Sequence, residues 1–239
     1  MLSDEAYGLA RLRETGSLIL PRPLLTGIAG ETAWLALAWL GMFPANADAQ
    51  QRLGSMLAQL HRCEADRYGW PRDNHIGLVH QPNAWSDNWC EFFTDQRLGF
   101  QLRLSEKGRN AEWVKRGFRL LDAMPALFEG YQPEASLLHG DLWSGNMAMR
   151  SDGEPVVFDP AAYYGDRETD LAMTELFGGF TPSFYSAYEA EWPVDEEYEL
   201  RRPFYQLYHV LNHANMFGGG YDKQASRMID ELLAKHVRH

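Results

Sequence analysis

Hydrophobic positions recur at helical spacing over most of the chain. Leu53, Leu57 and Leu60 fall on one face of a helix that begins near Asp48. Similar spacing predicts further helices over residues 3–14, 89–104, 111–128, 168–177, 182–191, 196–216 and 222–237. Pro203 lies inside the last but one of these, where it either kinks the helix or marks its true start.

Two short β segments interrupt this helical pattern. Residues 24–25 and 32–40 predict two strands joined by a turn around Gly27 and Gly30. Further along, a strand at 136–138 precedes a hairpin of 147–149 and 155–158, because Ser151-Asp152-Gly153 is a strong turn signal. The pattern therefore predicts an α+β protein, with a small part at residues 1–40 and a mostly helical part at residues 41–239.

Composition and charge narrow the classes of partner. The chain has 239 residues, 45% of them hydrophobic, which is enough for one domain of ordinary size or one large lobe with a small one. Its 33 acidic and 22 basic residues give a formal charge of −11. Such a chain is a poor electrostatic partner for nucleic acid or for an anionic membrane. Any phosphate chemistry must therefore depend on local donors or on a metal ion.

The cysteines and the first residues indicate the compartment. Cys63 and Cys90 show no spacing typical of a disulfide framework or of a metal site. The first ten residues carry acids and lack the apolar stretch of a secretory signal. We therefore expect a cytoplasmic protein.

One polar constellation carries the chemistry. Asp141 and Asn146 lie five residues apart in a loop after a predicted strand, and Asp159 follows at the end of the hairpin. Since a hairpin folds back on itself, Asp159 is expected beside Asn146. Carboxylate and amide oxygens of this kind suit Mg²⁺, and one carboxylate remains to orient an acceptor hydroxyl. Spacing and context match the catalytic loop and metal-binding aspartate of kinases.

Longer motifs resemble one kinase family. The stretches LLHGDLWSGN (137–146), VVFDPAAYYGDRETDLAM (156–173) and LYHVLNHANMFGGGY (207–221) are similar to fructosamine kinases, also called ketosamine 3-kinases. This family belongs to the group that includes aminoglycoside phosphotransferases and protein kinases. The resemblance extends over essentially the whole chain. It implies a protein-kinase-like fold of two lobes, with residues 1–40 as an incomplete nucleotide-binding lobe and residues 41–239 as a helical catalytic lobe.

The resemblance also implies a role for individual residues. Asp141 would accept the proton of the sugar hydroxyl, while Asn146 and Asp159 would hold the Mg²⁺ bound to ATP. Glu5 would stand in the place of the helix glutamate that pairs with the phosphate-contacting lysine, and Asp170 would brace the catalytic loop. The backbone of the hinge would face adenine through Ala38, Trp39 and Leu40.

The expected substrate is a ketosamine, the sugar adduct of a free or protein-bound amine, phosphorylated on its third hydroxyl as a repair step. Substrate contacts are expected from Trp143, Gln81, Asn83, His209 and Asn212. Each has a structural interpretation too. Tryptophan is a common core residue, and Gln81 and Asn83 are equally well explained as loop braces.

The sequence departs from the family pattern in one respect. The family places a glycine-rich turn and an ATP-binding lysine before the helix glutamate, whereas here no lysine precedes Glu5 and the first lysine is Lys107. The glycines at 218–220 follow a predicted helix and are typical of a helix stop. Either residues upstream of this sequence are omitted from it, or the chain is a truncated form with little kinase activity.

Two alternatives to a ketosamine kinase remain open on the sequence. One is a kinase of another small hydroxylated amine, such as an aminoglycoside or choline. The other is a catalytically silent protein that binds sugar adducts. An exposed strand edge in the small N-terminal part would also favour self-association.

Overall fold

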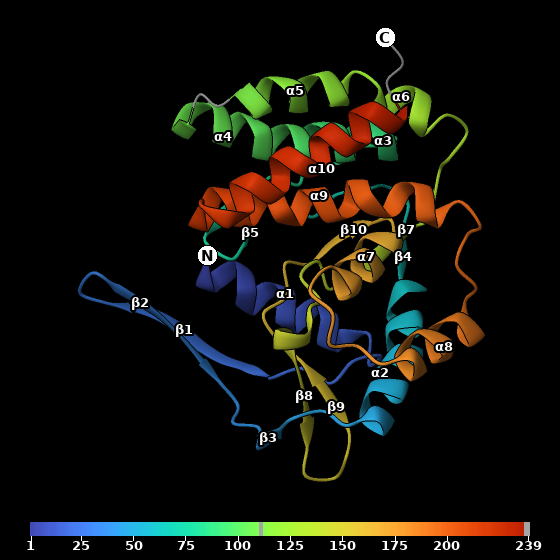
Figure 1. The fold of residues 1–239 in the computed structure, drawn as a ribbon. Helices are drawn as coiled ribbons and strands as arrows, with labels where there is room; N and C mark the ends of the chain where they lie inside the picture. Colours follow the sequence, from blue (N-terminus) through green and yellow to red (C-terminus); the bar gives the residue numbers. More distant parts are fainter. Residues whose placement is uncertain (110–111, 237–239) are drawn as a thin grey trace.

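The computed structural model describes residues 1–109 and 112–236 of the chain, which form a helical body and several short sheets (Figure 1). The helices are α1 (Leu2–Glu14), α2 (Ala47–His61), α3 (Trp89–Phe92), α4 (Phe100–Arg109), α5 (Glu112–Leu121), α6 (Met124–Leu127), α7 (Glu168–Leu176), α8 (Pro182–Glu191), α9 (Tyr198–Phe217) and α10 (Gly220–His236). A π-helical turn, η1 (Phe93–Gly99), and a 3₁₀ turn, η2 (Ser144–Asn146), complete them. No helix among the described residues is both long enough and apolar enough for a membrane crossing.

Within the described residues, the strands form four small antiparallel sheets, each of two or three strands. They are β1 (Pro23–Ala29), β2 (Thr32–Leu37), β3 (Met42–Phe43), β4 (Glu64–Ala65), β5 (Asn74–Ile76), β6 (Val79–Gln81), β7 (Ala135–Leu138), β8 (Met147–Arg150), β9 (Pro155–Val157) and β10 (Tyr163–Gly165). Their orders are β1-β2, β10-β7-β4, β3-β8-β9 and β5-β6. The two three-stranded sheets flank the segment that carries the predicted catalytic residues.

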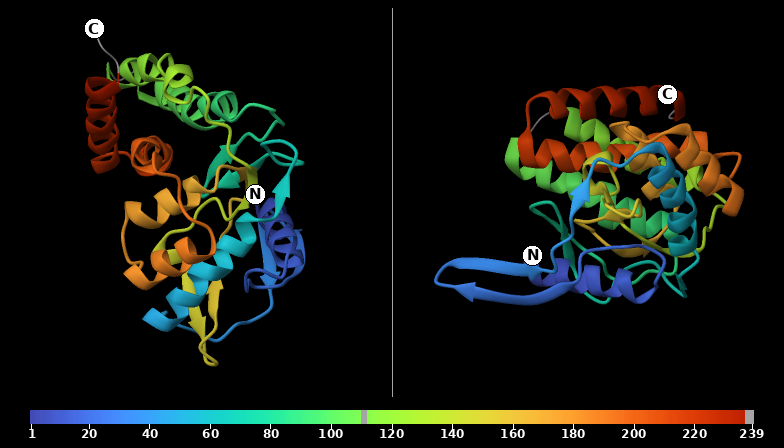
Figure 2. Two further views of the ribbon diagram at one scale, coloured as in Figure 1. Left: turned by 90° about the vertical axis from the view of Figure 1, so that its right-hand side faces the viewer. Right: turned by 90° about the horizontal axis from the view of Figure 1, so that it is seen from below.

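The N-terminal segment divides into a packed helix and a projecting ribbon. Leu9 and Leu12 of α1 are fully buried and belong to the same hydrophobic core as Leu53 of α2. The β1-β2 ribbon instead extends away from the body, as Figure 1 and the right-hand view of Figure 2 show, and Ile28 at its tip is 78% exposed. Only the ribbon therefore stands apart from the core, and the division of the chain at residue 40 stays a prediction.

Most predicted elements are confirmed, and the differences have local causes. The predicted helix 111–128 is wrong as a single helix: α5 ends at Leu121, and a new helix starts at Met124 with Pro125 in its first turn. Its predicted first residue, Ala111, lies outside the described residues, as does Val237. Pro203 does not mark the start of α9, which begins five residues earlier.

Candidate active site

The loop from His139 to Asn146 follows β7 and leads into the β8-β9 hairpin. The chain returns from the hairpin beside this loop, since the Phe158 amide donates to the Asn146 carbonyl at 3.1 Å. The Ala161 amide donates to the His139 carbonyl at 2.9 Å, which fixes the other end of the returning segment. Two adjoining backbone segments therefore present Asp141, Asn146 and Asp159 from the same region.

These three residues line one cavity of about 430 Å³. Glu5 of α1 and Asn212 of α9 also line it, so the cavity lies between the first helix, the catalytic loop and the ninth helix. The predicted convergence of two carboxylates and an amide is thus a feature of the structure. The predicted roles of these residues in catalysis and metal binding are taken up below as a proposal.

Local contacts fix the orientation of the Asn146 side chain, and the backbone of Asp159 has an unusual conformation. The Asn146 side-chain nitrogen donates to the Asp141 backbone carbonyl at 2.9 Å, so its amide oxygen is the atom left for a cation. Asp159 has φ of 57°, the left-handed conformation that residues other than glycine rarely adopt. Strained backbone of this kind clusters at functional sites, where the surrounding structure holds it in place.

Negative charge accumulates in the cavity. Burial, followed by the charges of Asp159 and Asp170, raises the pKa of Asp141 to about 7. Burial and then the charge of Asp159 raise the pKa of Glu5, and burial raises that of Asp159 itself. No lysine or arginine is among the described residues that line the cavity, and the α-amino group of Met1 pairs with Asp4 at 2.8 Å. Among the described residues, the carboxylates of Glu5, Asp141 and Asp159 therefore form no ion pair with a lysine, an arginine or the α-amino group.

This surplus of oxygen-bearing acidic groups fits a divalent cation. Within the described part of the chain, no three His, Cys, Asp or Glu side chains form a complete metal site by themselves. Mg²⁺ in nucleotide enzymes is often held by one or two protein carboxylates together with water and substrate phosphates, so a site here would need the nucleotide to complete it. Asn146 and Asp159 are the residues suited to hold the ion.

A buried carboxylate fixes the loop that carries Asp141. Asp170 of α7 accepts hydrogen bonds from the amides of His139 at 2.7 Å and Gly140 at 2.8 Å. Burial raises its pKa, but the hydrogen bonds from His61 and from the Gly140 amide hold the pKa below its ordinary value. Asp170 thus stays ionised and braces the backbone next to Asp141, as the family resemblance implies.

His61 and Tyr188 orient Asp170 and were not found from the sequence. His61 Nε2 lies 3.2 Å from the Asp170 carboxylate and Nδ1 lies 2.8 Å from the Tyr188 hydroxyl. Because burial lowers the pKa of His61, its ring is neutral; it donates from Nε2 and accepts at Nδ1. The Tyr188 oxygen accepts from Arg167 at 3.0 Å. No motif marks this chain of bonds, since its members lie on three separate helices.

Three predicted substrate residues lie away from the cavity. Gln81 and Asn83 are each 1% exposed, and the side-chain nitrogen of each donates to the Asn74 side-chain oxygen at 2.8 Å. Asn83 also accepts from Arg97 at 2.7 Å, so both amides brace a buried polar network, and their contact with substrate stays a prediction. His209 is 2% exposed and does not line the cavity, and burial lowers its pKa to about 3.

Two predicted substrate residues do reach the cavity. Trp143 is 39% exposed and lines it next to Asp141. Asn212 lines it as well, with its oxygen accepting from Gln101 at 3.3 Å. His213, Met216 and Phe217, from the same helix as Asn212, also line the cavity.

The predicted hinge lies just beyond β2, which ends at Leu37. Trp39 is 90% exposed, and the Ala38 amide donates to the Arg22 carbonyl at 2.8 Å. That donor is therefore engaged within the protein. The contact of this segment with adenine stays a prediction, which only its remaining peptide groups could fulfil.

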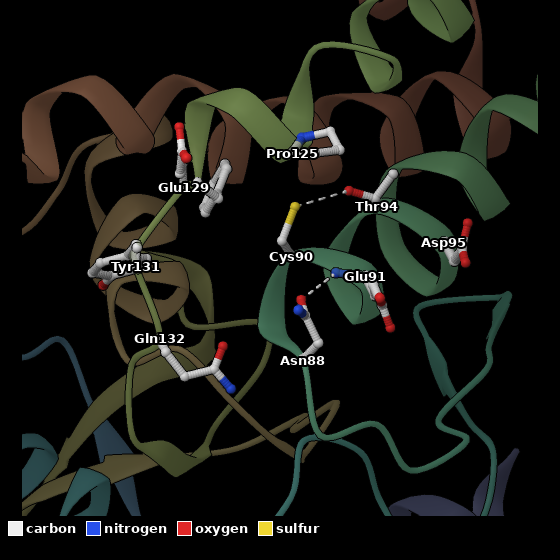
Figure 3. A pocket seen from close by; sticks show the side chains of 11 residues that line it. Asn88, Cys90, Glu91, Thr94, Asp95, Pro125, Glu129, Tyr131 and Gln132 are labelled. Atoms are coloured by element: carbon white, nitrogen blue, oxygen red, sulfur yellow. Dashed lines mark hydrogen bonds between the residues drawn. The ribbon is translucent and has the colours of Figure 1, made fainter.

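A second cavity, of about 510 Å³, lies on another part of the molecule (Figure 3). Residues of α3, of η1 and of the segment 125–132 line it, and the Cys90 side chain points toward Thr94, 3.9 Å away. None of the predicted site residues is among its lining residues. The cavity that holds the catalytic motifs is the smaller of these two, so its chemistry, and not its size, identifies it as the candidate site.

Comparison with known proteins identifies the family of this chain. The sequence model of the family described as "Fructosamine kinase" matches residues 1–235. The chain belongs to the fructosamine kinase family. It is 44% identical to a probable ketoamine kinase of Synechocystis sp., over 98% of this chain and 79% of that protein. It is 40% identical to the chloroplastic protein-ribulosamine 3-kinase of Arabidopsis thaliana, over 98% of this chain and 72% of that protein.

Solved structures confirm the fold of this fructosamine kinase family member. A Haemophilus somnus protein assigned as a fructosamine-3-kinase superposes with a TM-score of 0.90 at 29% identity, over 98% of this chain and 79% of that one. A choline kinase of Streptococcus pneumoniae, 13% identical, has a TM-score of 0.67 over 98% of this chain and 81% of that one. The predicted α+β, protein-kinase-like fold is therefore confirmed, and family membership makes the chain a phosphotransferase.

Proposed function

We propose that this chain transfers the γ-phosphate of ATP to a sugar hydroxyl of ketosamines such as fructosamine and ribulosamine adducts. The observation that carries the proposal is the shared cavity of Asp141, Asn146 and Asp159, inside the motifs typical of the family. The names of the relatives, a ketoamine kinase and a ribulosamine 3-kinase, support the same class of acceptor.

Each side chain has a defined task in the proposed transfer. Asp141 accepts the proton of the acceptor hydroxyl, and its raised pKa of about 7 suits a base that works near neutral pH. Bound Mg²⁺ would neutralise phosphate charge, and Asn146 and Asp159 would hold it there. Asp170 keeps the loop rigid, so that the Asp141 carboxylate stays aligned with the hydroxyl.

The remaining contacts are assigned from position. Glu5 borders the cavity near Asp159, where the family places its helix glutamate. Trp143 and Asn212 line the acceptor side, as a ring platform and an amide for hydroxyl groups. The exposed segment of Ala38, Trp39 and Leu40 is the proposed contact for adenine.

Product analysis tests the proposed function. Incubation with Mg-ATP and a fructosamine adduct is expected to give ADP and a sugar phosphate monoester, seen as a new ³¹P resonance. A parallel panel holds an aminoglycoside and choline. Transfer to choline or the aminoglycoside but to no ketosamine would reverse the assignment, and ketosamine binding without transfer to any acceptor would support the silent binding protein.

The β1-β2 ribbon supports the proposed self-association, and the two cysteines support the proposed location. Leu25, Ile28 and Trp34 of the ribbon are 67%, 78% and 40% exposed, which supports self-association through this ribbon. A molar mass in solution equal to that of one chain would contradict it. Cys63 and Cys90 are free thiols, which supports the proposed cytoplasmic location.

A further inference from the structure

A group of aromatic side chains continues the cavity outward from Trp143. The Trp143 and Phe177 rings lie 6.1 Å apart edge to face, and Phe177 lies 5.1 Å from the His213 ring. His213 in turn contacts Phe217 at 5.8 Å and Tyr221 at 5.0 Å. We name Phe177, His213, Phe217 and Tyr221 the aromatic wall.

The fold holds the aromatic wall at the rim of the cavity. Phe177 directly follows α7, and Phe217 is the last residue of α9. The chain then reverses through Gly218 and Gly219, whose φ angles of 64° and 61° favour glycine, and α10 begins at Gly220. The glycine-rich stretch is thus a tight corner that sets Phe217 and Tyr221 side by side, with their rings 6.2 Å apart.

The aromatic wall is exposed where an ordinary surface would be polar. Phe217 is 66% exposed and Phe177 is 37% exposed, while Phe217 and His213 also line the cavity that contains Asp141. Contiguous exposed apolar surface of this kind marks a binding site. Because this surface is continuous with the active-site cavity, its occupant must be a part of the substrate.

The chemistry of the aromatic wall indicates which part of the substrate it binds. A sugar carries hydroxyl groups that require hydrogen-bond partners, and the phosphate and its cation belong with Asn146 and Asp159. The phenylalanine rings supply neither hydrogen bonds nor charge. They suit an apolar or aromatic substituent on the amine nitrogen, and the protonated amine beside it gains from the ring faces of Trp143 and Phe177.

We propose that the aromatic wall binds the amine substituent of the ketosamine and makes the enzyme selective for adducts of apolar and aromatic amines. This inference rests on the proposed function and extends it to the part of the substrate that does not react. Phe177 and Phe217 act here as specificity-determining residues, not as catalytic ones. Burying a phenyl group on this surface is expected to raise kcat/KM about tenfold or more.

Two matched substrates test the inference. The fructose adduct of benzylamine and that of methylamine differ by one phenyl ring on the same charged nitrogen. With the wild-type chain, kcat/KM is expected to be about tenfold higher for the benzylamine adduct, mainly through a lower KM. Phe217→Ala and Phe177→Ala are each expected to bring this ratio close to one.

The control is Leu200→Ala, because Leu200 lies in the first turn of the same helix α9, is 45% exposed and does not line the cavity. It is expected to keep the wild-type ratio. The proposed role of the aromatic wall would be wrong if the wild-type kcat/KM values for the two adducts were nearly equal, or if both phenylalanine variants left their ratio unchanged. The kinase assignment would remain intact in either case. Turnover of neither adduct by the wild-type chain would instead overturn the proposed function and the inference together.

Discussion

Replacing Asp141 by asparagine is expected to lower kcat about 10³-fold, with the KM for ATP changed by less than about threefold. The asparagine amide has nearly the same shape but cannot accept the proton of the acceptor hydroxyl. Asn146 and Asp159, the proposed Mg²⁺ ligands, remain in place. Steady-state kinetics with varied ATP and varied ketosamine separate the two effects, and an unchanged kcat would remove Asp141 from its assigned role.

The stability of the Asp141→Asn variant is expected to depend on pH differently from that of the wild-type chain. The pKa of Asp141 is raised to about 7 in the folded chain, so stability present below its unfolded pKa is lost as the pH rises toward 7. Asparagine does not ionise and avoids this loss. Without metal and in the presence of a chelator, the melting temperature of Asp141→Asn should exceed that of wild type at about pH 8. The difference should shrink toward about pH 4.

Replacing Gly140 by alanine is expected to lower kcat/KM about 100-fold or more, since the methyl group would displace the backbone next to the base. Gly140 has φ of +82°, and a Cβ there would stand 2.2 Å from the Ala161 carbonyl oxygen. Both contacting groups are backbone, so one of them must move. A shift would also strain the bond from the Gly140 amide to Asp170.

Gly130→Ala is the matched control for this substitution. Gly130 has φ of +75°, so alanine there carries the same conformational strain, of about 1–2 kcal/mol, but a Cβ would meet nothing within 4 Å. It should reduce the melting temperature and leave kcat/KM within about twofold of wild type. Equal loss of activity in the two variants would show that left-handed strain alone, and not the contact with Ala161, explains the effect.

Much of the fold and site was predictable because it depends on local sequence. The periodicity around Leu53 and the turn at Ser151-Asp152-Gly153 specify a helix and a hairpin within a few residues. Since the hairpin returns to its origin, the proximity of Asp159 to Asn146 followed from its length alone. Both residues line the same cavity, as this proximity requires.

What could not be predicted depends on contacts between distant segments. Gln81 and Asn83 have the residue types of substrate contacts, but Asn74 and Arg97 engage their side chains in a buried network. His61 gives no signal on an otherwise ordinary helix face. Its partner Asp170 is 109 positions away, and only the packed fold brings the two together.

The central claim is that Asn146 and Asp159 hold a divalent cation for the nucleotide beside Asp141. Isothermal titration of ATP into the wild-type chain and into Asp159→Asn, each with and without Mg²⁺, tests it most directly. The account predicts Mg²⁺-dependent ATP binding by wild type, and about tenfold or greater weakening in Asp159→Asn only when Mg²⁺ is present. Equal Mg-ATP affinity in the two proteins would contradict it.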